Sequence, residues 1–320
     1  MTRPQGCFDV VVIGAGPSGA VASALLNKQG YRVLVLEKEY FPRFSIGESL
    51  LPQSMAFLEE AGMLPAVEAA GFQFKDGAAF ACGDKRDFFD FREKFSSGWG
   101  TTFQVQRDRF DKILADEAKR QGVEIHYGHT VTAFAYDAGK ATLQVLDDEG
   151  LEYTLEARFA LDASGFGRVL PRLLGLEQPS NLAARTSLFT HIQDNSSAEE
   201  FDRNKILITV HPLHRDIWYW LIPFSNGRAS VGVVASREFL ADFQGDAESK
   251  LRTLIAQAGT LANVLSEAQF DTRVGMIDGY SCNVKCLSGE GFALLGNAGE
   301  FLDPVFSSGV TIALKSASLA

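Results

Sequence analysis

Cysteine is scarce in this sequence, and its scarcity limits the kinds of protein that the chain can form. The 320 residues include four cysteines, at positions 7, 82, 282 and 286. So few cysteines argue against a disulfide framework and favour a reducing compartment. Cys282 and Cys286 are close in sequence, but no second pair of cysteines or histidines accompanies them. We therefore expect no metal site and no metal-dependent catalysis.

Long apolar runs and an excess of basic residues are also lacking. The longest apolar runs, FDVVVIGAG and VLVL, are much shorter than the roughly 18 residues of a membrane-spanning helix. The N-terminus lacks the charged-then-apolar pattern of a signal peptide. Lysine and arginine number 30 against 40 acidic residues, which gives a net charge of -10. These features predict a cytoplasmic protein that binds neither a membrane nor nucleic acid.

The order of apolar and turn segments predicts an α/β protein whose two parts are interleaved. Residues 8–13 form a β-rich apolar run, a helical stretch extends to about residue 29, and residues 31–36 form a second strand, which together make a Rossmann-type βαβ unit. The segment 107–121 has helical spacing. Four further segments, near 123–127, 130–136, 141–147 and 152–161, have strand patterns and suggest a small antiparallel layer.

A second, antiparallel sheet is expected between residues 183 and 236. This region contains several β-rich runs and a hairpin signal at Ser225-Asn226-Gly227. Residues 237–268 have a helical pattern, and FALLG at 292–296 predicts a buried strand before a terminal helix. Because that helix contains no Gly or Pro stop signal, we expect a C-terminal cap over the substrate to be missing.

A glycine-rich turn, Gly14-Ala15-Gly16-Pro17-Ser18-Gly19, joins the first predicted strand to the first predicted helix. Glu37 ends the next strand. Glycines permit a tight turn and a close approach of the backbone to a pyrophosphate, and the helix N-terminus offers unpaired N–H groups to that anion. An acidic side chain at the end of the second strand accepts from a ribose hydroxyl. This combination predicts a bound dinucleotide.

Two later segments resemble motifs of FAD enzymes. Leu161-Asp162-Ala163-Ser164-Gly165 and residues 295–304, LGNAGEFLDP, are similar to segments of FAD-dependent aromatic hydroxylases, geranylgeranyl reductases and flavin-dependent halogenases. The resemblance implies FAD as the cofactor. Asn297 stands where many of these proteins have Asp, and its amide can still hydrogen-bond a ribityl hydroxyl. No second glycine fingerprint follows a strand, so we expect a separate flavin reductase as a partner.

The segment Trp218-Tyr219-Trp220-Leu221-Ile222-Pro223 resembles the WxWxIP pattern of flavin-dependent halogenases. In that family Trp218, Trp220, Ile222 and Pro223 would separate the organic substrate from the flavin. The alternative is ordinary packing, because aromatic residues on one face of a strand are usually part of a core.

Lys75 aligns with the lysine that these halogenases place between flavin and substrate. It lies in GFQFKDGAAF, after a segment from Phe41 to Pro52 that is similar to the halogenase segment crossing the flavin. An ammonium among apolar neighbours loses hydration and could hydrogen-bond hypohalous acid or, when neutral, form a haloamine. The alternative for Lys75 is an exposed hairpin lysine.

The segment 303–310 is expected to begin the last helix, where free N–H groups favour an anion. The resemblance implies that the amides of Ser308 and Gly309 contact halide. Free-tryptophan halogenases have Glu at the position that aligns with Phe306, so Phe306 points to a small aromatic substrate, phenolic or pyrrolic, or to one tethered to a carrier protein.

Further residues are assigned to the cofactor on the same resemblance. Arg107 would open a helix near FAD, or belong to a solvated helix face, while Arg109 and Asp111 are expected to be helix-surface charges. The full set expected to bind FAD is Gly14, Gly16, Ser18, Gly19, Glu37, Lys38, Gly47, Glu48, Ser49, Arg107, Gly296 and Asn297.

The resemblance extends from Asp9 to Ala320 and implies an aromatic-hydroxylase-like architecture. We assign residues 1–80, 100–182 and 270–320 to an FAD-binding domain, and residues 81–99 and 183–269 to a substrate-side β-sheet domain. The implied reaction uses reduced FAD, oxygen and halide to halogenate an electron-rich substrate. Two alternatives stay open, namely an FAD-dependent monooxygenase (hydroxylase) or reductase on the same scaffold, and a non-catalytic flavin-binding protein.

Overall fold

The first strand, helix and second strand form the expected βαβ unit at the centre of the first sheet. In the computed structural model, which describes residues 4, 6–196 and 201–320, β1 (Phe8–Ile13) and β2 (Val33–Glu37) are parallel and α1 (Pro17–Lys28) connects them. The strand order is β18-β19-β10-β1-β2-β7, and all but the edge strand β18 run parallel. The remaining strands of this sheet are β7 (Glu124–Tyr127), β8 (Thr130–Asp137), β9 (Lys140–Leu146), β10 (Glu152–Asp162), β18 (Ser288–Gly289) and β19 (Phe292–Leu294).

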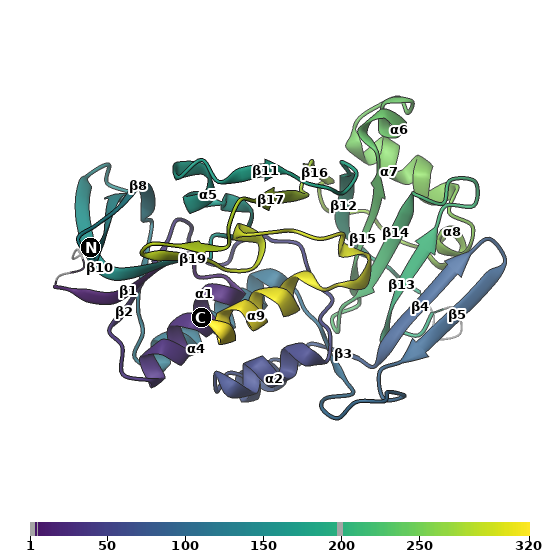
Figure 1. Cartoon of the computed structure of the whole chain (residues 1–320). Helices are drawn as coiled ribbons and strands as arrows, with labels where there is room; N and C mark the ends of the chain where they lie inside the picture. Colours follow the sequence, from purple (N-terminus) through teal and green to yellow (C-terminus); the bar gives the residue numbers. More distant parts are fainter. Residues whose placement is uncertain (1–3, 5, 197–200) are drawn as a thin grey trace.

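The two faces of the first sheet are covered differently. One face packs against α1, α4 (Arg107–Arg120) and α9 (Gly309–Leu319), which lie side by side below the sheet in Figure 1. Strands β8 and β9 and the short helix α5 (Val169–Leu173) cover the other face. The expected antiparallel layer therefore consists of β8, β9 and the start of β10. Including 123–127 in it was wrong, because β7 pairs in parallel with β2.

The second sheet has the order β16-β12-β15-β14-β13-β4-β5 and is antiparallel except between β13 and β4. Its strands are β4 (Gly77–Cys82), β5 (Lys85–Asp90), β12 (Thr186–Gln193), β13 (Lys205–Val210), β14 (Trp218–Pro223), β15 (Arg228–Ala235) and β16 (Gly275–Asp278). The expected hairpin at 225–227 joins β14 to β15. Because β4 and β16 belong to this sheet, it contains residues on the FAD side of the assigned boundaries, and the division into domains stays a prediction.

Apolar side chains alternate along the second sheet and give it two buried faces. One face packs against α7 (Ala247–Ala256) and α8 (Thr260–Val264), beside α6 (Arg237–Ala241). The opposite face carries Ile206, Trp220 and Ile222 and packs against Phe301 and Tyr280. This second face points towards the end of the first sheet at which β1 and β2 finish.

Short elements connect the two sheets. Helices α2 (Gln53–Glu60) and α3 (Leu64–Ala69) follow the segment that leaves β2, and β3 (Gln73–Lys75) pairs with β6 (Thr102–Gln104) at the junction. Strands β11 (Glu177–Pro179) and β17 (Cys282–Val284) form a small ribbon above the first sheet. The mixed α/β fold, with a Rossmann-type unit and an interleaved antiparallel sheet, confirms the fold class predicted from the sequence.

Candidate active site

The glycine-rich turn has the geometry that a dinucleotide requires. Gly14 has φ of +101°, and a Cβ on Gly19 would lie 1.9 Å from the carbonyl oxygen of Gly14. Gly16 precedes α1 and no side chain caps the helix, which leaves its first N–H groups available to an anion in the cavity that Gly16 and Ser18 line. Glycine is needed at these positions because a side chain would block the turn, the helix packing or the anion.

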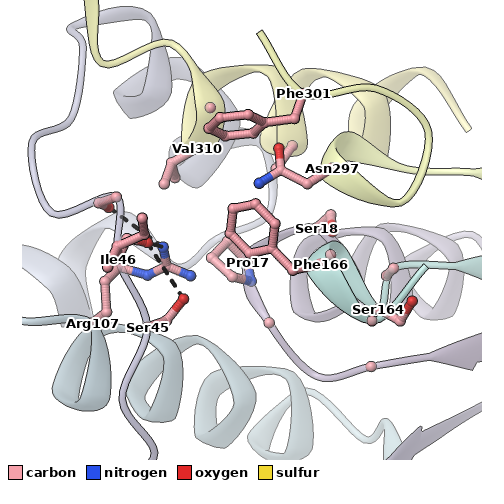
Figure 2. A pocket seen from close by; sticks show the side chains of 18 of the residues that line it. Pro17, Ser18, Ser45, Ile46, Arg107, Ser164, Phe166, Asn297, Phe301 and Val310 are labelled. Atoms are coloured by element: carbon pink, nitrogen blue, oxygen red, sulfur yellow. Dashed lines mark hydrogen bonds between the residues drawn. The ribbon is translucent and has the colours of Figure 1, made fainter. Parts of the chain in front are cut away.

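A cavity of about 430 Å³ extends from this turn to the second sheet. Figure 2 shows it bounded by Pro17 and Ser18 from α1, by Ile46 and Arg107, and by Asn297, Phe301 and Val310 from the C-terminal part of the chain. Expected FAD-binding residues that line it are Gly14, Gly16, Ser18, Glu37, Lys38, Gly47, Glu48, Ser49, Arg107 and Asn297.

Glu37, the last residue of β2, lines the cavity. Its carboxylate accepts from the amide of Ala15 at 2.8 Å and from that of Glu39 at 2.9 Å. Two carboxylate oxygens have more acceptor sites than these bonds use, so Glu37 can also accept from a hydroxyl in the cavity. This arrangement ties the acidic side chain to the glycine-rich turn and suits a ribose next to a pyrophosphate.

Two arginines share one buried carboxylate at the middle of the cavity. Asp111 is fully buried and accepts from Arg107 Nε at 2.7 Å and from Arg43 Nη1 at 3.3 Å. The expectation that Asp111 is a surface charge was therefore wrong, because α4 turns this position inward. Arg43 and Arg107 both line the cavity, and within the described part of the chain Arg43 Nε has no hydrogen-bond partner. An anionic diphosphate fits this cationic wall.

The turn after β10 projects an aromatic ring into the cavity. Asp162 is buried and accepts from the amides of Ser164, at 2.9 Å, and Leu170, at 2.6 Å, which holds the turn in place. Figure 2 shows the ring of Phe166 between Pro17 and Asn297. Its centroid lies 5.2 Å from that of Phe301. These apolar walls suit a flat, conjugated ring system.

The last helix begins near the end of the segment 303–310 that was expected to contain its start. Asp303 caps a short 3-10 turn over Pro304–Phe306, Ser307 takes a left-handed conformation with φ of +58°, and α9 starts at Gly309. The helix therefore starts within the predicted segment 303–310, after this 3-10 turn. Gly309 lines the cavity, whereas Ser308 is not among the lining residues.

Gly296 lies behind the cavity wall. Its amide donates to Ser316 of α9 at 2.9 Å, and a Cβ would lie 2.9 Å from that of Ala313. Its neighbour Asn297 does line the cavity. Like Gly19, Gly296 thus allows close packing of the chain, and Asn297 is the residue that faces the cavity.

The WYWLIP segment forms β14, and its alternation brings three side chains to the cavity. Trp218, Trp220 and Ile222 line it, with the two indole centroids 6.0 Å apart, while Pro223 is not among the lining residues. Trp220 Nε1 donates to Ser230 Oγ at 3.0 Å. A Cβ on Gly232, opposite Trp220, would lie 2.4 Å from the indole, so this glycine makes room for the ring.

Lys75 is a buried lysine and not an exposed hairpin residue. It is 1% exposed, and its Nζ donates to Ser49 Oγ at 2.7 Å and to the carbonyl of Leu50 at 2.8 Å. The ring centroid of Phe91 lies 5.1 Å from Nζ. Burial lowers the pKa of the Lys75 ammonium to about 7. The neighbouring Asp76 carboxylate binds Lys205 instead, at 2.9 Å.

Several site residues have no signal in the sequence. Phe166 and Tyr280 line the cavity, and His191 of β12 contacts Glu48, which also lines it. Each is a common residue type without a diagnostic spacing, and only the tertiary contacts reveal it.

Comparisons with known proteins identify the family. The family model for the FAD binding domain matches residues 7–280. The 1H-pyrrole-2-carbonyl-(peptidyl-carrier protein) chlorinase of Pseudomonas fluorescens is 31% identical over 98% of this chain and 74% of its own length. This chain belongs to the flavin-dependent halogenase family.

Two solved structures are similar to this chain, each over 98% of its length. The flavoprotein/dehydrogenase from Cytophaga hutchinsonii is 46% identical with a TM-score of 0.93 and is covered over 76% of its length. The myxobacterial chondrochloren halogenase CndH, a variant of the FAD-dependent halogenases, is 33% identical with a TM-score of 0.88 and is covered over 74%. The chain thus spans about three quarters of each protein.

Family membership makes this halogenase-family chain an FAD-dependent oxidoreductase, and FAD fits the cavity described above. The open glycine turn and the arginine pair suit its pyrophosphate, Glu37 suits its ribose, and the aromatic walls suit its flavin. Among the described residues, no helix has both the length and the apolarity to cross a membrane. The same residues contain no cluster of metal-ligating side chains.

Proposed function

We propose that this protein halogenates an electron-rich organic substrate, using reduced FAD, oxygen and chloride or bromide. The observation that carries the proposal is a fully buried lysine beside the cofactor cavity, whose Nζ donates to a serine hydroxyl and a backbone carbonyl. An amine in this environment can exchange between its charged and neutral forms near neutral pH. That property suits a group that passes an electrophilic halogen to a substrate.

The residues of the chain would act mainly by position. Bound reduced FAD would supply the oxygen activation that oxidises halide to an electrophilic, hypohalous-type species. The amides of Ser308 and Gly309, before and at the start of α9, would hold the halide, since no side chain caps that helix. Lys75 would hold the electrophile, and Trp218, Trp220 and Ile222 would keep the substrate from the flavin. The halogen then replaces a proton of the substrate.

The substrate class we favour is phenolic, pyrrolic or tethered to a carrier protein. Phe306, which ends the short 3-10 turn and is 66% exposed, offers an apolar and uncharged surface next to the proposed halide position. The relative named as a chlorinase of a carrier-bound pyrrole supports this class. A separate flavin reductase is the expected partner, because the described residues offer one dinucleotide cavity with glycine-turn geometry.

A second candidate function is that of an FAD-dependent dehydrogenase or reductase. The relative at 46% identity carries the description flavoprotein/dehydrogenase, which favours this candidate. In that case NAD(P)H or the organic substrate would reduce the bound flavin directly, and Lys75 would be a buried structural residue.

The test supplies the purified protein with FAD, a flavin reductase, NADH, oxygen and bromide or chloride, and traps electrophilic halogen with monochlorodimedone or a phenol panel. Lys75→Ala and added catalase run beside it, and Lys140→Ala, which changes an exposed lysine on β9, is the matched control. Halogenated product that requires Lys75 but not Lys140 supports the halogenase. Reduction of the bound flavin by NAD(P)H without halogenated product supports the dehydrogenase.

A further inference from the structure

One hydroxyl group separates the ammonium of Lys75 from the cofactor cavity. Ser49 lines the cavity, and Lys75 is not among its lining residues. Lys75 Nζ donates to Ser49 Oγ at 2.7 Å. Ser49 is 3% exposed and Lys75 is 1% exposed, so bulk water does not compete for this hydrogen bond. The Ser49 hydroxyl is thus the side-chain link between the buried amine and the cavity.

The backbone sets the distance between these two residues. Ser49 forms an antiparallel bridge with Gln104, and Lys75 pairs with Thr102 on the same strand, β6. The amide of Leu50 also donates to the carbonyl of Phe103 on this strand, at 3.1 Å. Because both partners are anchored to β6, the contact does not depend on the flexibility of the lysine side chain alone.

A serine hydroxyl can accept one hydrogen bond and donate another at the same time. Ser49 Oγ accepts from Lys75, and within the described part of the chain no acceptor for its own proton is found. That proton is therefore available to a molecule in the cavity. The carbonyl of Leu50, which is the second acceptor of the ammonium, has no proton to offer.

We propose that Ser49 is a positioning residue that holds the Lys75 amine at the cavity wall and relays a hydrogen bond from it to a molecule in the cavity. This inference rests on the halogenase function proposed above, and it gives Ser49 a role besides contact with FAD. Ser49 forms no covalent bond in this role. Its hydroxyl accepts from the amine and donates to an oxygen acceptor, such as that of hypohalous acid.

The first test observes Lys75 directly and does not depend on turnover. Protein labelled with 13C at the lysine Cε positions is titrated by NMR, and Lys75→Arg identifies the signal of Lys75. We expect the wild-type midpoint near pH 7. Ser49→Ala removes an acceptor that stabilises the charged amine, so its midpoint should fall by about one pH unit, which is a tenfold change in the equilibrium.

Two variants complete this titration. Ser49→Thr keeps a hydroxyl and should keep the wild-type midpoint. Ser23→Ala removes another fully buried hydroxyl, one that donates within α1 to Ala20, and should also leave the midpoint unchanged. A Lys75 midpoint that is the same in Ser49→Ala and wild type overturns the inference.

The second test separates positioning from cofactor contact. For Ser49→Ala at saturating FAD we expect kcat for halogenation to fall at least about tenfold, while KM for the substrate is unchanged. Weaker FAD binding with normal kcat at saturating FAD would overturn the inference. If the wild type makes no halogenated product yet the Lys75 midpoint shifts in Ser49→Ala, the positioning contact stands and the proposed function fails.

Discussion

His191 Nε2 lies 2.6 Å from Oε1 of Glu48, and this contact joins the second sheet to the loop that lines the cofactor cavity. Glu48 is 3% exposed. Burial by itself lowers the pKa of His191, but the hydrogen bond and the charge of Glu48 outweigh that effect and raise the pKa above its ordinary value of 6.5. The two residues are 143 positions apart in sequence.

Replacement of His191 should make stability less dependent on pH. A raised pKa in the folded state stabilises the fold fully below pH 6.5, and this contribution is lost as the pH rises through the raised value. His191→Gln should therefore cost about 1 to 2 kcal/mol at pH 5.5 and less at pH 8.5. Urea denaturation at both pH values measures the difference. A cost that is equal at both would show that the charge on His191 contributes nothing.

Replacement of Lys75 should change the free energy of unfolding at low pH in the opposite direction to replacement of His191. The pKa of Lys75 falls from 10.5 to about 7 on folding, so the penalty for burying its charge is full below pH 7 and disappears above pH 10.5. Lys75→Met should thus gain stability relative to wild type at pH 6 and lose that gain by pH 10. Lys140→Met at an exposed site is the control and should show no such trend. A pH-independent difference for Lys75→Met would mean that folding does not lower the pKa of Lys75.

Asp111→Asn should destabilise the protein and weaken FAD binding together. The carboxylate of Asp111 lies between Arg107 and Arg43. Its replacement leaves two partly buried guanidinium groups without their shared anionic partner, which should lower the free energy of unfolding by about 3 kcal/mol. Asp108→Asn, in the first turn of the same helix, is the matched control and should cost less than about 0.5 kcal/mol. Thermal unfolding and a fluorescence titration with FAD measure the two effects. Equal behaviour of both variants would contradict the shared role of Asp111.

Two glycine substitutions should separate folding from cofactor binding. A Cβ on Gly19 meets the carbonyl of Gly14 at 1.9 Å, whereas one on Gly16 has its nearest neighbour, Arg43 Nη2, at 3.4 Å. Gly19→Ala should lower the stability of the apoprotein by several kcal/mol, as backbone overpacking does. Gly16→Ala should leave the apoprotein stable and reduce FAD affinity at least about tenfold. Chemical denaturation without FAD and FAD titration distinguish them, and an unstable Gly16→Ala apoprotein would refute the second part.

Local features of this fold could be predicted because they depend on residues close in sequence. Alternation of apolar residues determines β14 with Trp218 and Trp220 on one face, since side chains along a strand alternate between its two sides. The glycine-rich turn between β1 and α1 follows from the backbone freedom of Gly14. Predictions failed where the outcome depends on distant segments, as at 123–127, where β7 pairs in parallel with β2.

The sequence by itself determined the βαβ unit, the dinucleotide fingerprint and the strand that carries the tryptophans, because spacing along the chain is enough to specify them. Only the tertiary structure decided that Asp111 is buried between two arginines, that Glu48 meets His191, and that Lys75 reaches the cavity through Ser49. These contacts join segments that lie apart in the chain. Burial and charge pairing arise when such segments pack together, and the spacing of residues along one segment carries no information about them.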